Sequence, residues 1–93
     1  LDAEADNLSR AIHSDYVRYR QAYEELLTER KNVELATANY NTVATRFDEG
    51  IALITDMLDA ANSRLEAEQL LVNARINIIY YYYRLMFTSG KIV

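Results

Sequence analysis

Hydrophobic residues recur at every seventh position along the first half of the chain. From position 5 the row is apolar or aromatic throughout: Ala5, Ile12, Tyr19, Leu26, Val33, Tyr40 and Phe47. A companion row three residues later holds Leu8, Ala22, Ala36 and Val43 but is interrupted by Asp15 and Glu29. A seven-residue apolar repeat is typical of helices that pack along one stripe. The pattern therefore predicts one long helix over about residues 2–47.

Gly50 separates this stripe from a second one in a different register. The second row is Ile51, Leu58, Leu65, Val72, Ile79 and Met86. The first row, continued, would fall on Glu68 and Arg75 instead. Because glycine is the usual residue at the left-handed position that ends a helix, we expect a turn over about 48–51 and a returning helix over about 52–89. A continuous or swapped long helix is the alternative, since glycine inside a helix costs only about 1 kcal/mol.

The returning helix carries more apolar surface than one neighbour can cover. One further row holds Met57, Leu71, Ile78 and Leu85, broken by Arg64, and its companion row holds Leu53, Ala60, Ala67, Ala74 and Tyr81. These rows are offset by one residue, about 100° of rotation, from the row that begins at Ile51. The pattern predicts a long antiparallel, coiled-coil-type hairpin that oligomerises through the second face, as in a bundle or a helical tube.

Composition agrees with an all-helical fold and narrows the function. The chain has 93 residues, no Pro and only two Gly, so we expect a single domain without the turns that sheets require. The absence of Cys excludes disulfides and thiolate metal sites. A net charge of −4 argues against a nucleic-acid partner. The stretch 76–87 is too short to span a bilayer, and the chain, beginning at Leu1, has the character of an excerpt from a longer protein.

No group of residues in the sequence indicates an enzyme, a cofactor or a metal. His13 is the only histidine, and Asp15, two residues on, would point to a different face of a helix. The four consecutive tyrosines from Tyr80 to Tyr83 are interpreted mainly as packing, with a junction to another domain as the alternative. Asp56 and Asp59 share a helix face near its start, where they either favour the helix dipole or, in an oligomer, form an acidic ring.

Residues around the turn resemble the outer-membrane efflux protein family, the TolC-like channels. The resemblance lies in Ala36, Tyr40, Phe47, Gly50, Ile54 and the run Asp56-Met57-Leu58-Asp59-Ala60, which is similar to the second periplasmic hairpin of that family. Leu65 with Ala67 (one residue closer than in the family), Leu71 with Ala74, Leu85 and Gly90 resemble its returning helix. The resemblance is best from about residue 33 to 92.

The resemblance implies a passive conduit. The parent would be a trimer in the outer membrane of a Gram-negative bacterium, with this hairpin in the wall of a periplasmic tube and a β-barrel, outside these residues, in the membrane. The tip at Phe47, Glu49, Gly50 and Ile51 would contact a periplasmic adaptor, which joins the channel to an inner-membrane pump. Asp56 and Asp59 would constrict the pore.

Two positions depart from the family pattern. Leu53 stands where the family often has a capping Ser or Thr, and an apolar side chain cannot cap, so Asp48 is a possible substitute. Ala52 stands where some members have a gating Arg, so any gate here works without it. The other functions considered are a coiled-coil assembly module and a periplasmic adaptor hairpin. The adaptor is disfavoured because no Arg has Leu four residues later.

Overall fold

The computed structural model describes residues 2–90, and these form two helices without any strand. Helix α1 spans Asp2–Asp48, and helix α2 spans Ile54–Gly90. The all-helical hairpin predicted from the seven-residue rows is thereby confirmed. Residues 49–53 lie outside both helices, so the continuous helix considered as an alternative does not form.

The turn is built on Gly50, the one described residue with a positive φ, at 76°. The Gly50 N–H donates to the Phe47 carbonyl at 3.0 Å, and the Ile51 N–H donates to the Arg46 carbonyl at 2.8 Å. These two bonds form the Schellman motif, which satisfies the last carbonyls of a helix and requires a left-handed residue. The register break in the sequence therefore coincides with a backbone reversal that glycine favours.

Helix α2 begins at Ile54, two residues later than the expected start at 52. The reason lies in the backbone, because the Ala52 N–H still bonds to the Arg46 carbonyl at the end of α1. The Leu53 N–H instead donates to Oδ2 of Asp56, at 3.1 Å. Leu53 thus occupies the N-cap position, and the carboxylate three residues later supplies half of a capping box. The expected substitute, Asp48, is the last residue of α1.

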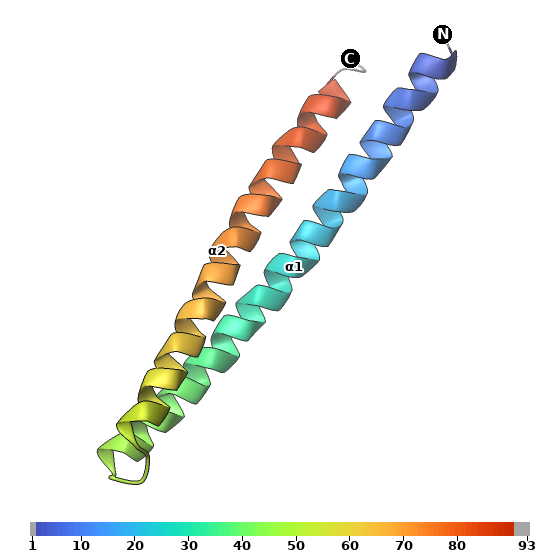
Figure 1. Cartoon of the computed structure of the whole chain (residues 1–93). Helices are drawn as coiled ribbons and strands as arrows, with labels where there is room; N and C mark the ends of the chain where they lie inside the picture. The colour runs from blue at the N-terminus through green and yellow to red at the C-terminus, as the bar shows by residue number, and fades with distance from the viewer. Residues whose placement is uncertain (1, 91–93) are drawn as a thin grey trace. The chain divides into compact units, whose positions relative to one another are not determined.

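The chain divides into two compact units, which we describe separately. The turn unit comprises residues 27–73, and the terminal unit comprises residues 1–26 and 74–93, described over 2–26 and 74–90. Within each unit a segment of α1 lies antiparallel to a segment of α2 (Figure 1).

Alanines form the buried centre of both units. Ala22 and Ala74 are 4% and 0% exposed in the terminal unit, and Ala60 and Ala67 are 5% and 8% exposed in the turn unit. Three of these belong to the alanine row of the sequence, which lets the helices approach closely. Larger residues are only half-buried around them: Leu8, Ile12, Tyr19, Leu26, Ile78, Tyr81 and Leu85 in the terminal unit, and Val33, Tyr40, Val43, Phe47, Met57 and Leu71 in the turn unit.

Candidate functional site

A buried carboxylate joins the two helices of the terminal unit. Asp15 is 5% exposed and interrupts the companion row of α1. Its Oδ1 accepts a hydrogen bond from Nε of Arg84 at 3.1 Å, and its Oδ2 accepts one from Oγ1 of Thr88 at 2.7 Å. Both carboxylate oxygens are therefore satisfied, as a buried charge requires. We call Asp15, Arg84 and Thr88 the polar clasp.

Arg84 also forms a hydrogen bond to a residue of its own helix, and this bond favours the charged form of the guanidinium. Its Nη1 donates to the Tyr80 hydroxyl at 3.2 Å. The hydrogen bond to Tyr80, the charge interaction with Tyr80 and then the negative charge of Asp15 raise the pKa of the Arg84 guanidinium above its ordinary value. Because the pKa of an arginine is already high and is raised further here, Arg84 stays cationic across the physiological pH range. Arg84 therefore makes no contribution to pH dependence of the clasp in that range.

The polar clasp offers no reactive centre. His13 is exposed on α1, whereas Asp15 faces α2, so the two side chains lie on different faces of the helix. Across residues 2–90 no group of three or more His, Cys, Asp or Glu side chains is placed to hold a metal ion. The clasp satisfies the buried carboxylate in the observed register and so favours this pairing of the two helices.

The turn presents a mixed surface at the positions expected to contact an adaptor. Ile51 is 71% exposed and Leu53 is 70% exposed, so two large apolar side chains project from a loop of five residues. Glu49 is also exposed, whereas Phe47 is half-buried at the end of the α1 stripe. The four expected tip residues thus lie at or beside one turn, with the exposed Leu53 next to them, and their contact with an adaptor stays a prediction.

Asp56 and Asp59 both lie exposed in the first turns of α2. Asp56 has a structural partner, the Leu53 N–H, and also lies in the first turn, where a carboxylate favours the helix dipole. Among the residues that the structure describes, none forms a hydrogen bond or ion pair with Asp59. The capping interpretation therefore accounts for Asp56, while Asp59 has the freer side chain for any role in a pore.

Two further polar residues lie in the packing stripes of the turn unit. The Arg64 guanidinium lies over the Tyr40 ring at 5.4 Å from its centroid and pairs with Oε1 of Glu68 at 3.2 Å. Glu29 is half-buried, and its Oε2 is a buried oxygen that has no hydrogen-bond partner among residues 2–90. Such an oxygen destabilises the folded state, because its hydration is lost without replacement.

Of the four consecutive tyrosines at 80–83, two pack against α1 and two lie more exposed on α2. Tyr81 is half-buried in the intrachain seam, and Tyr82 contacts Tyr19 of α1 with ring centroids 6.1 Å apart. Tyr80 and Tyr83 remain 55% and 65% exposed. Packing within the chain therefore accounts for Tyr81 and Tyr82 and leaves Tyr80 and Tyr83 on an open surface.

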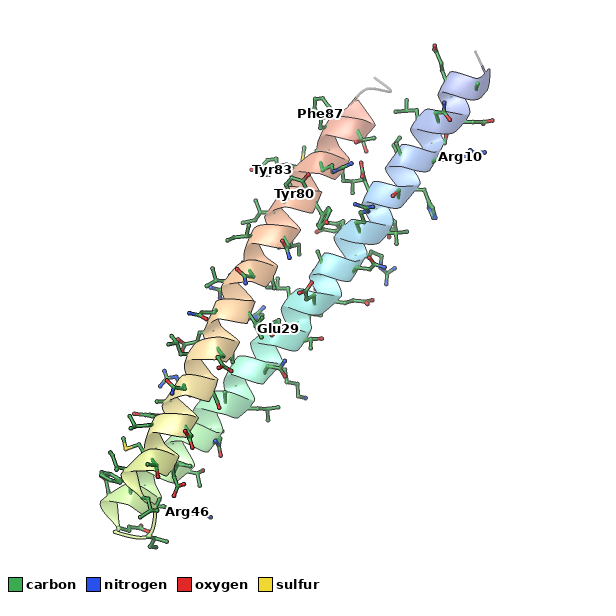
Figure 2. All side chains as sticks on the ribbon, in the orientation of Figure 1. Arg10, Glu29, Arg46, Tyr80, Tyr83 and Phe87 are labelled. Carbon is green, nitrogen blue, oxygen red and sulfur yellow. The ribbon has the colours of Figure 1, made fainter. Side chains whose placement is uncertain are left out.

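This open surface of α2 in the terminal unit carries six large exposed hydrophobic side chains, and we call it the aromatic face. Its members, all between 54% and 69% exposed, are Ile76, Ile79, Tyr80, Tyr83, Met86 and Phe87. Tyr83 and Phe87 project from α2 on the side away from α1 (Figure 2). An open groove is lined by Tyr80, Tyr83 and Phe87 together with Arg84 and Thr88 of the polar clasp.

The turn unit carries its own exposed apolar residues on α2. Leu58, Leu65 and Val72 are 56%, 53% and 50% exposed, and all three belong to the seven-residue row that begins at Ile51. In each unit α2 thus has apolar residues both on the side that faces α1 and on the side that faces outward. A helix that is apolar on two faces is typical of a position between two neighbours.

Comparison of the chain with protein-family models, with curated proteins and with solved structures found no match. Within the described part of the chain, neither helix combines the length and hydropathy that crossing a membrane requires.

Proposed function

We propose that this chain is a segment of the helical wall of a trimeric efflux or secretion channel in the outer membrane of a Gram-negative bacterium. The observation that carries the proposal is the two-sided α2. In each unit the alanines of its alanine row are buried within the chain, while the row that begins at Ile51 stays at least half exposed. A wall helix needs this arrangement, because each has a neighbour on both sides.

The proposed mechanism is passive. The hairpin lies in the periplasm and lines part of a water-filled conduit, and the turn engages a periplasmic adaptor linked to an inner-membrane pump. The exposed Ile51 and Leu53 supply apolar contact area at the turn, and Glu49 supplies a charge. The two hydrogen bonds of the Schellman motif at Gly50 hold these residues in one arrangement, which lowers the entropy lost on binding.

Asp59 is the residue proposed to act on ions. In a trimer, three copies of an exposed carboxylate around an axis attract cations and disfavour anions. Asp56 contributes charge at the same level, although it also caps α2. The two carboxylates lie three residues apart and so share one face of the helix.

The proposal is tested by single-channel recording on the channel protein that contains this hairpin. Asp59→Asn is expected to lower the cation-to-anion permeability ratio, and Asp56→Asn with Asp59→Asn to lower it further. Glu34→Gln, an exposed acid on α1, is the control for a general change of charge. An unchanged permeability ratio in the double variant would refute the acidic ring.

A coiled-coil assembly module is the second candidate. One exposed seam suffices for assembly, and the outward row of α2 provides it. The two candidates differ at the turn. A wall segment needs the exposed Ile51 for its adaptor, whereas an assembly module does not. Binding of a purified periplasmic adaptor that is lost in Ile51→Asp would favour the wall segment.

A further inference from the structure

We propose that the aromatic face of α2 binds a lipid surface with anionic phosphate headgroups. Its six apolar side chains, each more than half exposed, enter the boundary between headgroups and acyl chains. Arginines at the two edges of the face contact the phosphates. The inference goes beyond the proposed wall function and does not rest on it, because it concerns residues 74–90 alone.

The aromatic face occupies one continuous side of α2. At about 100° per residue, all six members lie within about 60° of the direction opposite to Ala74, which is 0% exposed. Gly90 is the only other residue of 74–90 in this sector, so no polar or charged side chain interrupts the face between 76 and 87. An uninterrupted apolar side that carries aromatic rings is typical of helices that lie at a membrane surface.

An arginine lies at each edge of the aromatic face. By the same geometry, Arg75 lies about 80° from the centre of the face on one side, and Arg84 lies about 100° from it on the other. Arg75 is exposed and forms no ion pair among residues 2–90. The Tyr80 hydroxyl accepts a hydrogen bond from Arg84, whose side chain stays 49% exposed. Arginine can bury its stem beside apolar groups and keep its guanidinium at a phosphate, so both edges suit a headgroup layer.

The charges of this part of α2 favour an anionic surface. Residues 74–90 contain two arginines and no acid. Asp15 offsets the charge of Arg84, so Arg75 supplies most of the attraction. The other described acids of the terminal unit belong to α1, which packs on the side of α2 away from the aromatic face. Packed helix axes are about 8–10 Å apart, and the Debye length at physiological salt is about 8 Å, so these acids are largely screened from the lipid.

The turn unit does not combine these features. Asn62 and Gln69 lie on the outward side of α2 there, within about 60° of the direction opposite to Ala67. Residues 54–73 also contain four acids and one arginine, which disfavour an anionic surface. The narrower outward row of the turn unit therefore suits the neighbouring helix of the proposed wall, and the lipid contact is confined to the terminal unit.

The charge part of the inference is tested by sedimentation of the whole chain with phosphatidylglycerol or phosphatidylcholine vesicles at increasing lipid concentration. The native chain is expected to bind phosphatidylglycerol more tightly. Arg75→Gln is expected to weaken that binding about fivefold and to leave binding to phosphatidylcholine unchanged. Arg10→Gln, which removes an exposed arginine from α1, is the matched control and should bind like the native chain.

The apolar part is tested by Tyr83→Ser with Phe87→Ser, at positions that are 65% and 69% exposed. This variant is expected to bind phosphatidylglycerol vesicles at least tenfold more weakly, with unchanged helix content by circular dichroism. Leu58→Ser with Leu65→Ser removes two side chains of similar exposure from the turn unit and should bind like the native chain. An equal loss in both variants would overturn the inference.

Tryptophan fluorescence gives an independent measurement, because the chain has no Trp of its own. Lipids with brominated acyl chains are expected to quench the Tyr83→Trp chain and not the Leu65→Trp chain. Equal quenching of the two would overturn the inference, as would a native chain that binds neither kind of vesicle or binds both equally. Self-association of the native chain without vesicle binding would assign the aromatic face to a second copy instead. None of these results changes the permeability test of the wall function.

Discussion

Replacing Gly50 with alanine tests the backbone geometry of the turn. Gly50 has φ of 76°, and a Cβ added there meets no atom within 4 Å. The substitution therefore causes no steric clash with the rest of the chain, and its effect comes from the backbone alone. A left-handed conformation costs an L-residue about 1–2 kcal/mol. Alanine also lowers the conformational entropy of the unfolded chain, which stabilises the folded state by about 0.4–1 kcal/mol. The net destabilisation is therefore about 1 kcal/mol.

The assay is urea unfolding followed by circular dichroism, at a concentration low enough to keep the chain monomeric. With an m-value of about 1–3 kcal/mol/M, a loss of about 1 kcal/mol lowers the urea midpoint by roughly 0.3–1 M. Gly90→Ala is the matched control, because Gly90 ends α2 without a positive φ and also has no atom within 4 Å of a new Cβ. It is expected to be neutral or slightly stabilising. A Gly50→Ala chain as stable as the native one would falsify the proposed role of the left-handed turn.

Three further substitutions test the polar contacts of the two units. Asp56→Ala is expected to lower stability by about 0.5–1 kcal/mol in the same urea assay. The variant loses the hydrogen bond to the Leu53 N–H and a favourable negative charge at the start of α2, and an unchanged urea midpoint would contradict this. Asp15→Ala is expected to speed amide hydrogen exchange in the terminal unit by about tenfold, whereas Asp6→Ala, an exposed acid on the same helix, should not. Glu29→Leu is expected to stabilise the chain by about 1 kcal/mol by removing an unpartnered buried oxygen, and a loss of stability would show that Glu29 has a partner in solution.

The spacing of apolar residues was sufficient to predict the fold, because a two-helix chain leaves few choices. Every position of the first row except Ala5 is half-buried, as expected of a stripe that faces the partner helix. Ala5 is exposed near the start of α1. The end of α1 was also predicted, because Gly50 favours the left-handed conformation that ends a helix. The start of α2 did not, since an apolar N-cap with a carboxylate three residues later has no strong signature in the capping residue itself.

The polar clasp was not predicted, because Asp15 and Arg84 are 69 residues apart and each alone only interrupts an apolar pattern. A signal was available, however. Asp15 falls on the companion row of α1, and Thr88 falls one heptad after Tyr81 on the alanine row of α2. Polar residues on two facing rows of an antiparallel pair indicate a buried hydrogen bond. A comparison of the polar positions on the two facing rows, rather than of the apolar repeat within each row, predicts the clasp.

The thin intrachain core and the polar clasp have a common explanation. The four buried hydrophobic residues among those described are all alanines, so burial within the chain provides little of the hydrophobic stabilisation that a domain of this length needs. Alanines also pack with little preference for one register, and a shifted pairing would lose few contacts. A buried carboxylate satisfied in one register supplies that preference. The larger apolar side chains then remain exposed, and their burial by a neighbouring chain would add to the stability of the hairpin.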